Sequence, residues 1–169
     1  PNLSSIKNEN KANKDQPKID KSKYYLIENL KQLDEWIKEA EEIGEVAVDT
    51  ETSSLDPHRA DLIGISLSTR IGKACYIPIG HKSKKNIKKE EVLKKIKPLL
   101  EDPSIKKIGQ NMKFDFIVFF KQGIRLTSVE DTMLMSYVLD AGKNRHNMDK
   151  LSEIHLGHKT IAFKELVGS

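Results

Sequence analysis

Two acidic residues stand two positions apart in the segment Val46-Ala47-Val48-Asp49-Thr50-Glu51-Thr52. The β-branched valines before them predict a buried strand over 45–50, and strand residues two apart point to the same face. We therefore expect the carboxylates of Asp49 and Glu51 to project together from the strand's end. Without a cation, burial and mutual repulsion should raise the pKa of at least one of them. A pair of divalent ions would relieve that repulsion, and Mg²⁺ prefers such oxygen ligands.

A pair of solvated loop acids is the simpler interpretation of this short motif, and a second segment bears on the choice. Gln110 to Asp115 opens a predicted helix whose following residues, 116–120, are all apolar. A helix that is apolar on every side is expected inside a core, where an aspartate is unusual. Asn111 and Asp115 share a face, and the positive helix N-terminus would help to keep Asp115 ionised. The alternative is that Asp115 only supports the start of the helix.

Taken together, these segments resemble the first two exonuclease motifs of family A DNA polymerases. The resemblance rests on Asp-Thr-Glu-Thr at 49–52, on Leu55, and on Gly-Gln-Asn-x-Lys-Phe-Asp at 109–115. It extends from about Tyr24 to the last residue. Further segments that look like the proofreading domain of bacterial DNA polymerase I are 62–66, 74–78, 97–100, 130–134, 145–149 and 158–161.

The resemblance implies two-metal hydrolysis, with Mg²⁺ or Mn²⁺, at the 3′ end of single-stranded DNA. Asp49 would then bridge both metals. Glu51 would bind one metal and orient the attacking water, while Asp115 would hold the second metal. Two such cations lower the pKa of a bound water and stabilise the leaving oxygen.

Three further residues are implied substrate contacts. Leu55 and Phe163 look like the apolar residues that wedge or stack against terminal bases, a contact that tolerates any base. Ordinary core packing is the alternative for both of them. Asn111 would position the substrate strand or brace the helix that carries Asp115.

One family feature does not appear before Ser169. The third motif is a tyrosine with an aspartate four residues later. Tyr137 and Asp140 are three apart and lie in the wrong place, so we assign them to a packing helix. We therefore expect a C-terminally incomplete domain with three of four carboxylates, and a chain that is itself weakly active or inactive.

The remaining patterns predict an α/β fold of the ribonuclease H-like type, a mixed sheet flanked by helices. Three strands should form an antiparallel meander, since the turn at 69–72 is short, and parallel strands should follow. Residues 1–23 are polar and read as a flexible linker or tail, with the exonuclease domain over 24–169. The expected strands lie at 24–27, 45–50, 62–68, 72–79, 105–109 and 128–131, and the expected helices at 30–40, 92–100, 111–121, 133–139 and 148–156.

Composition limits the partners. No apolar run reaches the roughly 18–20 residues that span a bilayer. The first twenty residues are polar, and Cys75 is the only cysteine, so we expect a cytoplasmic protein with no membrane partner. The net charge of +4 comes mainly from the six lysines and three acids of residues 1–23, so charge alone does not indicate DNA binding. The expected partners, a single-stranded DNA 3′ end and the polymerase region of the same parent chain, follow from the resemblance.

Three other functions compete with an active exonuclease. A non-catalytic module could keep the fold to scaffold the polymerase or to hold single-stranded DNA, although Asp49, Glu51 and Asp115 are all present. A haloacid dehalogenase-type phosphatase would need a second aspartate at the position of Glu51. Ribonuclease D-like exonucleases share the acids, but the matches around Asp131 and His158 favour the polymerase relative.

Overall fold

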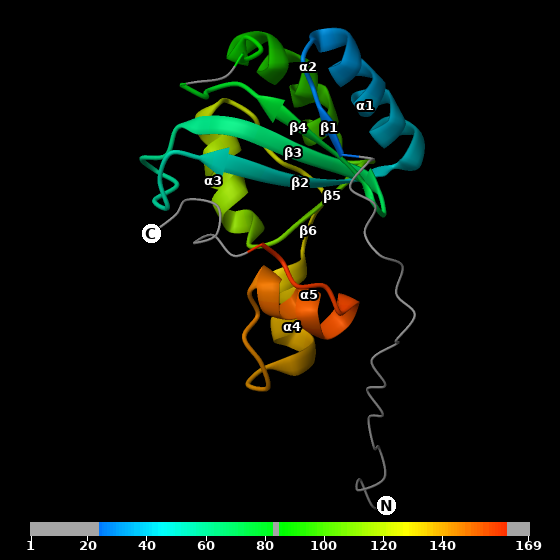
Figure 1. Ribbon diagram of the computed structural model, residues 1–169, viewed down its shortest axis with the longest axis vertical. Coiled ribbons are helices and arrows are strands. Elements are labelled where there is room, and N and C mark those ends of the chain that lie inside the picture. The colour runs from blue at the N-terminus through cyan, green and yellow to red at the C-terminus, as the bar shows by residue number, and fades with distance from the viewer. Residues whose placement is uncertain (1–23, 83–84, 162–169) are drawn as a thin grey trace, which may run out of the picture.

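The computed structural model describes residues 24–82 and 85–161, which form one mixed sheet with helices around it (Figure 1). The six strands run in the order β1-β4-β3-β2-β5-β6. Strands β2, β3 and β4 pair antiparallel, whereas β1 pairs parallel with β4, β5 with β2, and β6 with β5. The antiparallel meander extended by parallel strands is therefore confirmed. The strands are β1 Tyr24–Leu26, β2 Glu45–Thr52, β3 Leu62–Arg70, β4 Lys73–Pro78, β5 Lys106–Gly109 and β6 Val129–Asp131.

The helices begin and end close to the positions that the sequence predicts. The Asn29 side chain caps the first helix by accepting from the Gln32 N–H, and Gly44 ends it in the left-handed conformation, with φ of 80°. Figure 1 shows α1 and α2 together above the sheet, and α4 and α5 extending below it. The helices are α1 Leu30–Ile43, α2 Lys89–Glu101, α3 Met112–Lys121, α4 Thr132–Asp140 and α5 Met148–Leu156.

One continuous core lies between the sheet and the helices. It includes Leu33 and Ala40 of α1, Ile96 of α2, and Ile65 and Ile77 of the sheet, all of them buried. Cys75 is buried as well, and burial raises the pKa of its thiol to about 12. No helix in the described part of the chain is long and apolar enough to cross a membrane.

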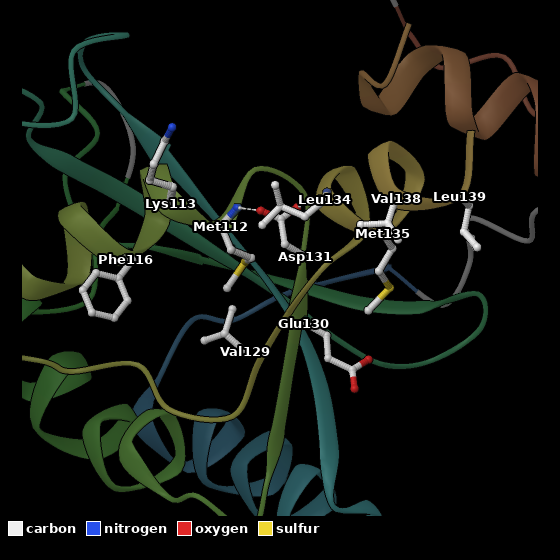
Figure 2. A pocket seen from close by; sticks show the side chains of 10 residues that line it. All are labelled: Met112, Lys113, Phe116, Val129, Glu130, Asp131, Leu134, Met135, Val138 and Leu139. Carbon is white, nitrogen blue, oxygen red and sulfur yellow. Dashed lines mark hydrogen bonds between the residues drawn. The ribbon is translucent and has the colours of Figure 1, made fainter. Parts of the chain in front are cut away.

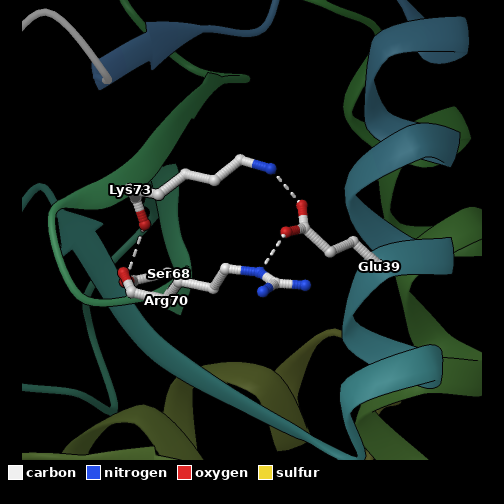
Figure 3. Close-up of polar contacts among 4 residues, drawn as sticks. All are labelled: Glu39, Ser68, Arg70 and Lys73. Atoms are coloured by element: carbon white, nitrogen blue, oxygen red, sulfur yellow. Dashed lines mark hydrogen bonds and ion pairs between the residues drawn. The ribbon is translucent and has the colours of Figure 1, made fainter.

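An ion cluster fastens α1 to the β3–β4 hairpin (Figure 3). Glu39 of α1 accepts from Arg70 Nε at 3.0 Å and from the ammonium of Lys73, whose Nζ also lies 4.8 Å from the centre of the Trp36 ring. Burial disfavours the charge on Glu39, but the hydrogen bonds and charges of Lys73 and Arg70 outweigh it and lower the pKa. These contacts hold the turn between β3 and β4 against α1.

A buried lysine joins three segments on the side of β2 away from the hairpin. Lys107 of β5 is fully buried, and its ammonium donates to the carbonyls of Asp102 and Ile105 at 2.6 Å and to Thr127 Oγ1 at 3.3 Å. Burial lowers its pKa, and the negative charge of Asp102 partly opposes that shift. These contacts hold the end of α2 and the segment before β6 against β5.

Candidate active site

Strand β2 places two carboxylates at the centre of the sheet, between β3 and β5. Its residues alternate, with Val46, Val48 and Thr50 buried, Asp49 partly buried and Glu51 exposed. Asp49 pairs with Ser66 of β3, and Glu51 pairs with Gly64, next to a register shift at Glu51/Thr52. Asp49 and Glu51 therefore share the face that their spacing predicts.

Helix α3 brings a third carboxylate to the same end of β2. Asp115 is 3% exposed, and its Oδ1 accepts from the Thr50 backbone N–H at 3.0 Å and from Thr50 Oγ1 at 2.6 Å. These two bonds cross 65 positions of sequence and fasten the first turn of α3 to the strand that carries the other two acids. Both bonds end on Oδ1, so Oδ2 takes no part in them.

The negative charges of Glu51 and Asp115 act on Asp49. The pKa of Asp49 is raised from 3.8 to about 6, first by burial and then by the negative charges of Asp115 and Glu51. This confirms the expectation that at least one acid of the pair has a raised pKa. A neighbouring cation would stabilise a carboxylate whose pKa is raised in this way, because the cation favours the charged form.

The expected effect of the helix N-terminus on Asp115 is outweighed. Burial raises the pKa of Asp115, while the hydrogen bonds from Thr50 and from its own backbone N–H lower it; the charge of Asp131 adds to the rise, and the net shift is upward. An N-terminal position is thus not sufficient to keep a carboxyl this deeply buried at its ordinary pKa.

The chemistry of these donors fits a hard divalent cation. Carboxylate oxygens from Asp49, Glu51 and Asp115 are the ligand type that Mg²⁺ and Mn²⁺ prefer. Within the residues that the structure describes, no three Asp, Glu, His or Cys side chains are already grouped closely enough to hold a metal ion. Glu51 is exposed, so its side chain is not held by packing and is free to change rotamer.

Asp131 is a buried site residue whose role the sequence did not reveal. Its Oδ1 accepts from the backbone N–H groups of Asn111 at 3.0 Å and Met133 at 2.9 Å, and its Oδ2 accepts from that of Met112 at 2.9 Å. One carboxylate therefore binds the N-terminal ends of both α3 and α4. The only available sequence signal was an acidic residue directly before a helix, which is typical of an N-cap.

The structure places Asn111 at the entrance to α3 in the left-handed conformation, with φ of 58° and no side-chain hydrogen bond that caps the helix. Its backbone binds Asp131, so bracing of this helix goes through the main chain of Asn111. Leu55 lies in the loop between β2 and β3 and is 97% exposed, so it does not pack in the core. Phe163 and residues 1–23 lie outside the described residues.

Helix α3 is not buried on every side, contrary to the expectation from its apolar sequence. Phe116 and Phe120 are 38% and 59% exposed and stack on each other, with ring centres 6.4 Å apart. Beside them lies a largely apolar hollow of about 660 Å³ (Figure 2). It is lined by Met112, Lys113, Phe116, Val129, Glu130, Asp131, Leu134, Met135, Val138 and Leu139.

Tyr137 and Asp140 lie in a helix, as the sequence predicts, but that helix does not pack into the core. Both residues belong to α4, but none of the residues of α4 is buried. Tyr137 is half exposed, with its ring 3.9 Å from that of His146 between centres. Neither residue contributes to the electrostatic environment of Asp49.

Comparison with known proteins identifies the class of protein to which this chain belongs. A family model described as 3′-5′ exonuclease matches residues 24–169. The chain is 42% identical to DNA polymerase I of Rhizobium leguminosarum, over 89% of the chain and 17% of that protein. The chain therefore belongs to the 3′-5′ exonuclease domains of the family A DNA polymerase I proteins, and it spans about a sixth of the relative's length.

Several solved structures have folds similar to that of this chain. Brucella melitensis NrnC with bound Mg²⁺ is 25% identical, with a TM-score of 0.61 over 87% of this chain and 67% of that one. NrnC is also known bound to pGG. Escherichia coli RNase D, an exoribonuclease, has a TM-score of 0.66 over 86% of this chain and 36% of its own, but at 18% identity it shows the fold alone. The ribonuclease H-like fold class is confirmed.

Proposed function

We propose that this chain is a module of a metal-dependent 3′→5′ exonuclease that removes terminal nucleotides from single-stranded DNA, and that the 169-residue chain on its own is weakly active. The observation that carries the proposal is the placement of Asp49 and Glu51 on one face of β2 and of Asp115, bonded to Thr50, at the same end of that strand; burial and the charges of the other two acids raise the pKa of Asp49 there. Such an arrangement is electrostatically unfavourable without a cation. The matching exonuclease family and the Mg²⁺ bound by NrnC support the same chemistry.

Each acid has a separate role in the proposal. Asp49, whose pKa is raised in part by the charges of the other two acids, would contact both metal ions. Glu51 is the most exposed of the three, so it would bind one ion and orient the water. Asp115, fixed by Thr50, would hold the second ion. Bound divalent ions supply a water of lowered pKa and neutralise charge on the phosphate and the leaving 3′ oxygen.

Substrate contact is assigned to Leu55 and Asn111, near this end of β2, and to Phe163, which lies outside the described residues. The exposed side chain of Leu55 is free to stack on a base, Asn111 lies at the entrance to α3, and Phe163 is assigned from the family resemblance alone. By analogy with the DNA polymerase I relatives, the partner within the parent protein is a polymerase region, and the compartment is the cytoplasm.

The test measures Mn²⁺ affinity by calorimetry and single-turnover hydrolysis of a 5′-labelled single-stranded oligonucleotide. Asp49→Ala should lower the hydrolysis rate by about 100-fold or more, because it removes the carboxylate proposed to contact both ions. Asp61→Ala is the matched control, since Asp61 is an exposed acid in the loop after β2. Unchanged hydrolysis by Asp49→Ala would place the activity elsewhere. DNA binding without Mn²⁺ binding or hydrolysis would instead favour the non-catalytic module.

A further inference from the structure

Strand pairing puts a tyrosine on the same face as the acids. Asp49 of β2 pairs with Ser66 of β3, which pairs with Tyr76 of β4. In the next row, Glu51 pairs with Gly64, which pairs with Pro78. Directly paired residues present their side chains to the same side of a sheet, so Tyr76 shares the face of the two carboxylates.

The Tyr76 ring does not lie over Ser66, with which Tyr76 pairs. It leans toward Gly64, which pairs with Glu51. A Cβ added to Gly64 would lie 1.9 Å from the Tyr76 hydroxyl and 2.3 Å from the ring carbon that bears it. The hydroxyl thus occupies the space that a side chain at position 64 would fill. Paired Cβ atoms are about 4.5–5.5 Å apart across antiparallel strands, so the hydroxyl lies beside Glu51, within reach of its carboxylate.

A histidine fixes the hydroxyl in this position. Tyr76 Oη lies 2.6 Å from His81 Nε2, and the two rings meet edge to face with centres 5.7 Å apart. His81 is held in turn by Asn86, which accepts from the His81 backbone N–H at 2.8 Å and donates to its carbonyl at 2.6 Å. Burial raises the pKa of the Tyr76 phenol, and the negative charge of Glu51 raises it further, which agrees with their closeness.

We infer that Tyr76 is a positioning residue of this site, whose hydroxyl, oriented by His81, hydrogen-bonds the Glu51 carboxylate and holds it toward Asp49. The inference rests on the proposed function, which gives Glu51 its role. His81 Nε2–H donates to the phenol oxygen, and the phenol proton is then free to donate to Glu51. A hydrogen bond to an exposed, rotatable carboxylate restricts it to the orientation in which it binds metal.

A double-mutant cycle on the 169-residue chain tests this, with Mn²⁺ affinity from calorimetry as the readout. Tyr76→Phe keeps the ring and removes only the hydroxyl, and it should weaken Mn²⁺ binding by about 3- to 10-fold. In a Glu51→Ala background the same change should have no further effect, because alanine leaves no side-chain acceptor through which the hydroxyl could act. Tyr24→Phe, on the exposed edge strand β1, should leave the affinity unchanged.

The possible outcomes separate this inference from the proposed function. Mn²⁺ binding that is unaffected by Tyr76→Phe, or weakened equally with and without Glu51, overturns the role of Tyr76 and leaves the metal site intact. Absence of Mn²⁺ binding by the unaltered chain overturns both. His81→Ala gives an independent check, since it should weaken binding in the Tyr76 chain but not in the Tyr76→Phe chain. Thermal melting of each variant establishes that it is folded.

Discussion

Thr50 holds a buried carboxylate in place with two hydrogen bonds, one from its main chain and one from its side chain. The backbone bond would survive any substitution except proline, whereas the hydroxyl bond depends on the residue type. A hydrogen bond to a charged group is worth about 1.5–3 kcal/mol, and more is lost when the carboxyl is left buried. Thr50 therefore fixes the position of Asp115 relative to Asp49.

Thr50→Val keeps the shape of the side chain and removes the hydroxyl. It should destabilise the chain by about 1.5–3 kcal/mol near neutral pH and weaken Mn²⁺ binding, because Asp115 loses its closest donor. Urea unfolding measures the first effect and calorimetry the second. Thr52→Val is the control, because its hydroxyl donates only to the carbonyl of Ser54 in the adjacent loop and should cost less. Equal losses at both positions would contradict the role of Thr50.

The raised pKa of Asp49 predicts how stability depends on pH when no metal is bound. The folded state binds a proton more tightly than the unfolded chain between pH 3.8 and about 6, so this carboxyl destabilises the fold as pH rises through that window. After allowance for solvent screening, the loss should be about 1–2 kcal/mol. Glu39, whose pKa is lowered, acts in the opposite direction but only near or below its unfolded value of 4.5.

Urea unfolding with a chelator present, compared between about pH 5 and pH 7, tests this expectation. Stability should fall over that interval in the unaltered chain and fall less steeply in Asp49→Asn, which cannot ionise at position 49 but keeps the raised pKa of Asp115. Mn²⁺ added at the upper pH should restore stability to the unaltered chain alone. A variant with the same slope as the unaltered chain would show that Asp49 is not the group responsible.

Among the elements, α3 and α4 depend on a single side chain from the end of β6. Asp131 accepts from backbone N–H groups at both helix starts, which would otherwise lack partners. Because α3 carries Asp115, the position of the third acid depends on a carboxylate that need not contact substrate or metal.

Asp131→Ala should therefore destabilise the chain by about 2–4 kcal/mol, since two helices lose their cap at once. Asp131→Asn keeps one acceptor oxygen and should cost less. Chemical unfolding gives both values, with Asp140→Ala as the control, because Asp140 pairs with Lys143 on the surface. A cost for Asp131→Ala no greater than for the control would show that the caps do not matter.

How far the sequence predicts this structure depends on the range of the interaction involved. Alternation in β2 and the spacing of Asn111 and Asp115 are local, and they identified the acids and their elements. The bond between Thr50 and Asp115, the double cap by Asp131 and the approach of Tyr76 to Gly64 join separate segments, and no local pattern encodes them. The apolar sequence of α3 predicts burial on every side, but Phe120 is exposed, because the sequence does not show which neighbours cover a helix.

Across the whole molecule, apolar side chains gather on the surface of the region below the sheet. Neither α4 nor α5 buries any residue, and Val138 and Leu139 of α4 are 85% and 77% exposed. Apolar residues that are solvent-exposed contribute little to folding but favour association between molecules.

Val138→Lys should accordingly change the free energy of unfolding by no more than about 0.5 kcal/mol, and it should reduce any self-association at high concentration. Val118→Lys makes the same chemical change in α3, where the side chain is fully buried, and should prevent folding. Thermal melting and sedimentation distinguish the two. Strong destabilisation by Val138→Lys would mean that this side chain packs against another part of the protein in solution.

The buried ammonium of Lys107 also makes it possible to measure the rate of a local opening in this chain. A reagent that acylates amines needs an accessible, uncharged nitrogen, and Lys107 offers neither access nor a free lone pair while three oxygens accept its protons. Exposed lysines such as Lys94 should react at once, so slow modification of Lys107 would record how often the junction of α2, β5 and β6 opens. Mass spectrometry of the labelled chain would then give the rate of modification at Lys107, and hence the rate at which this junction opens.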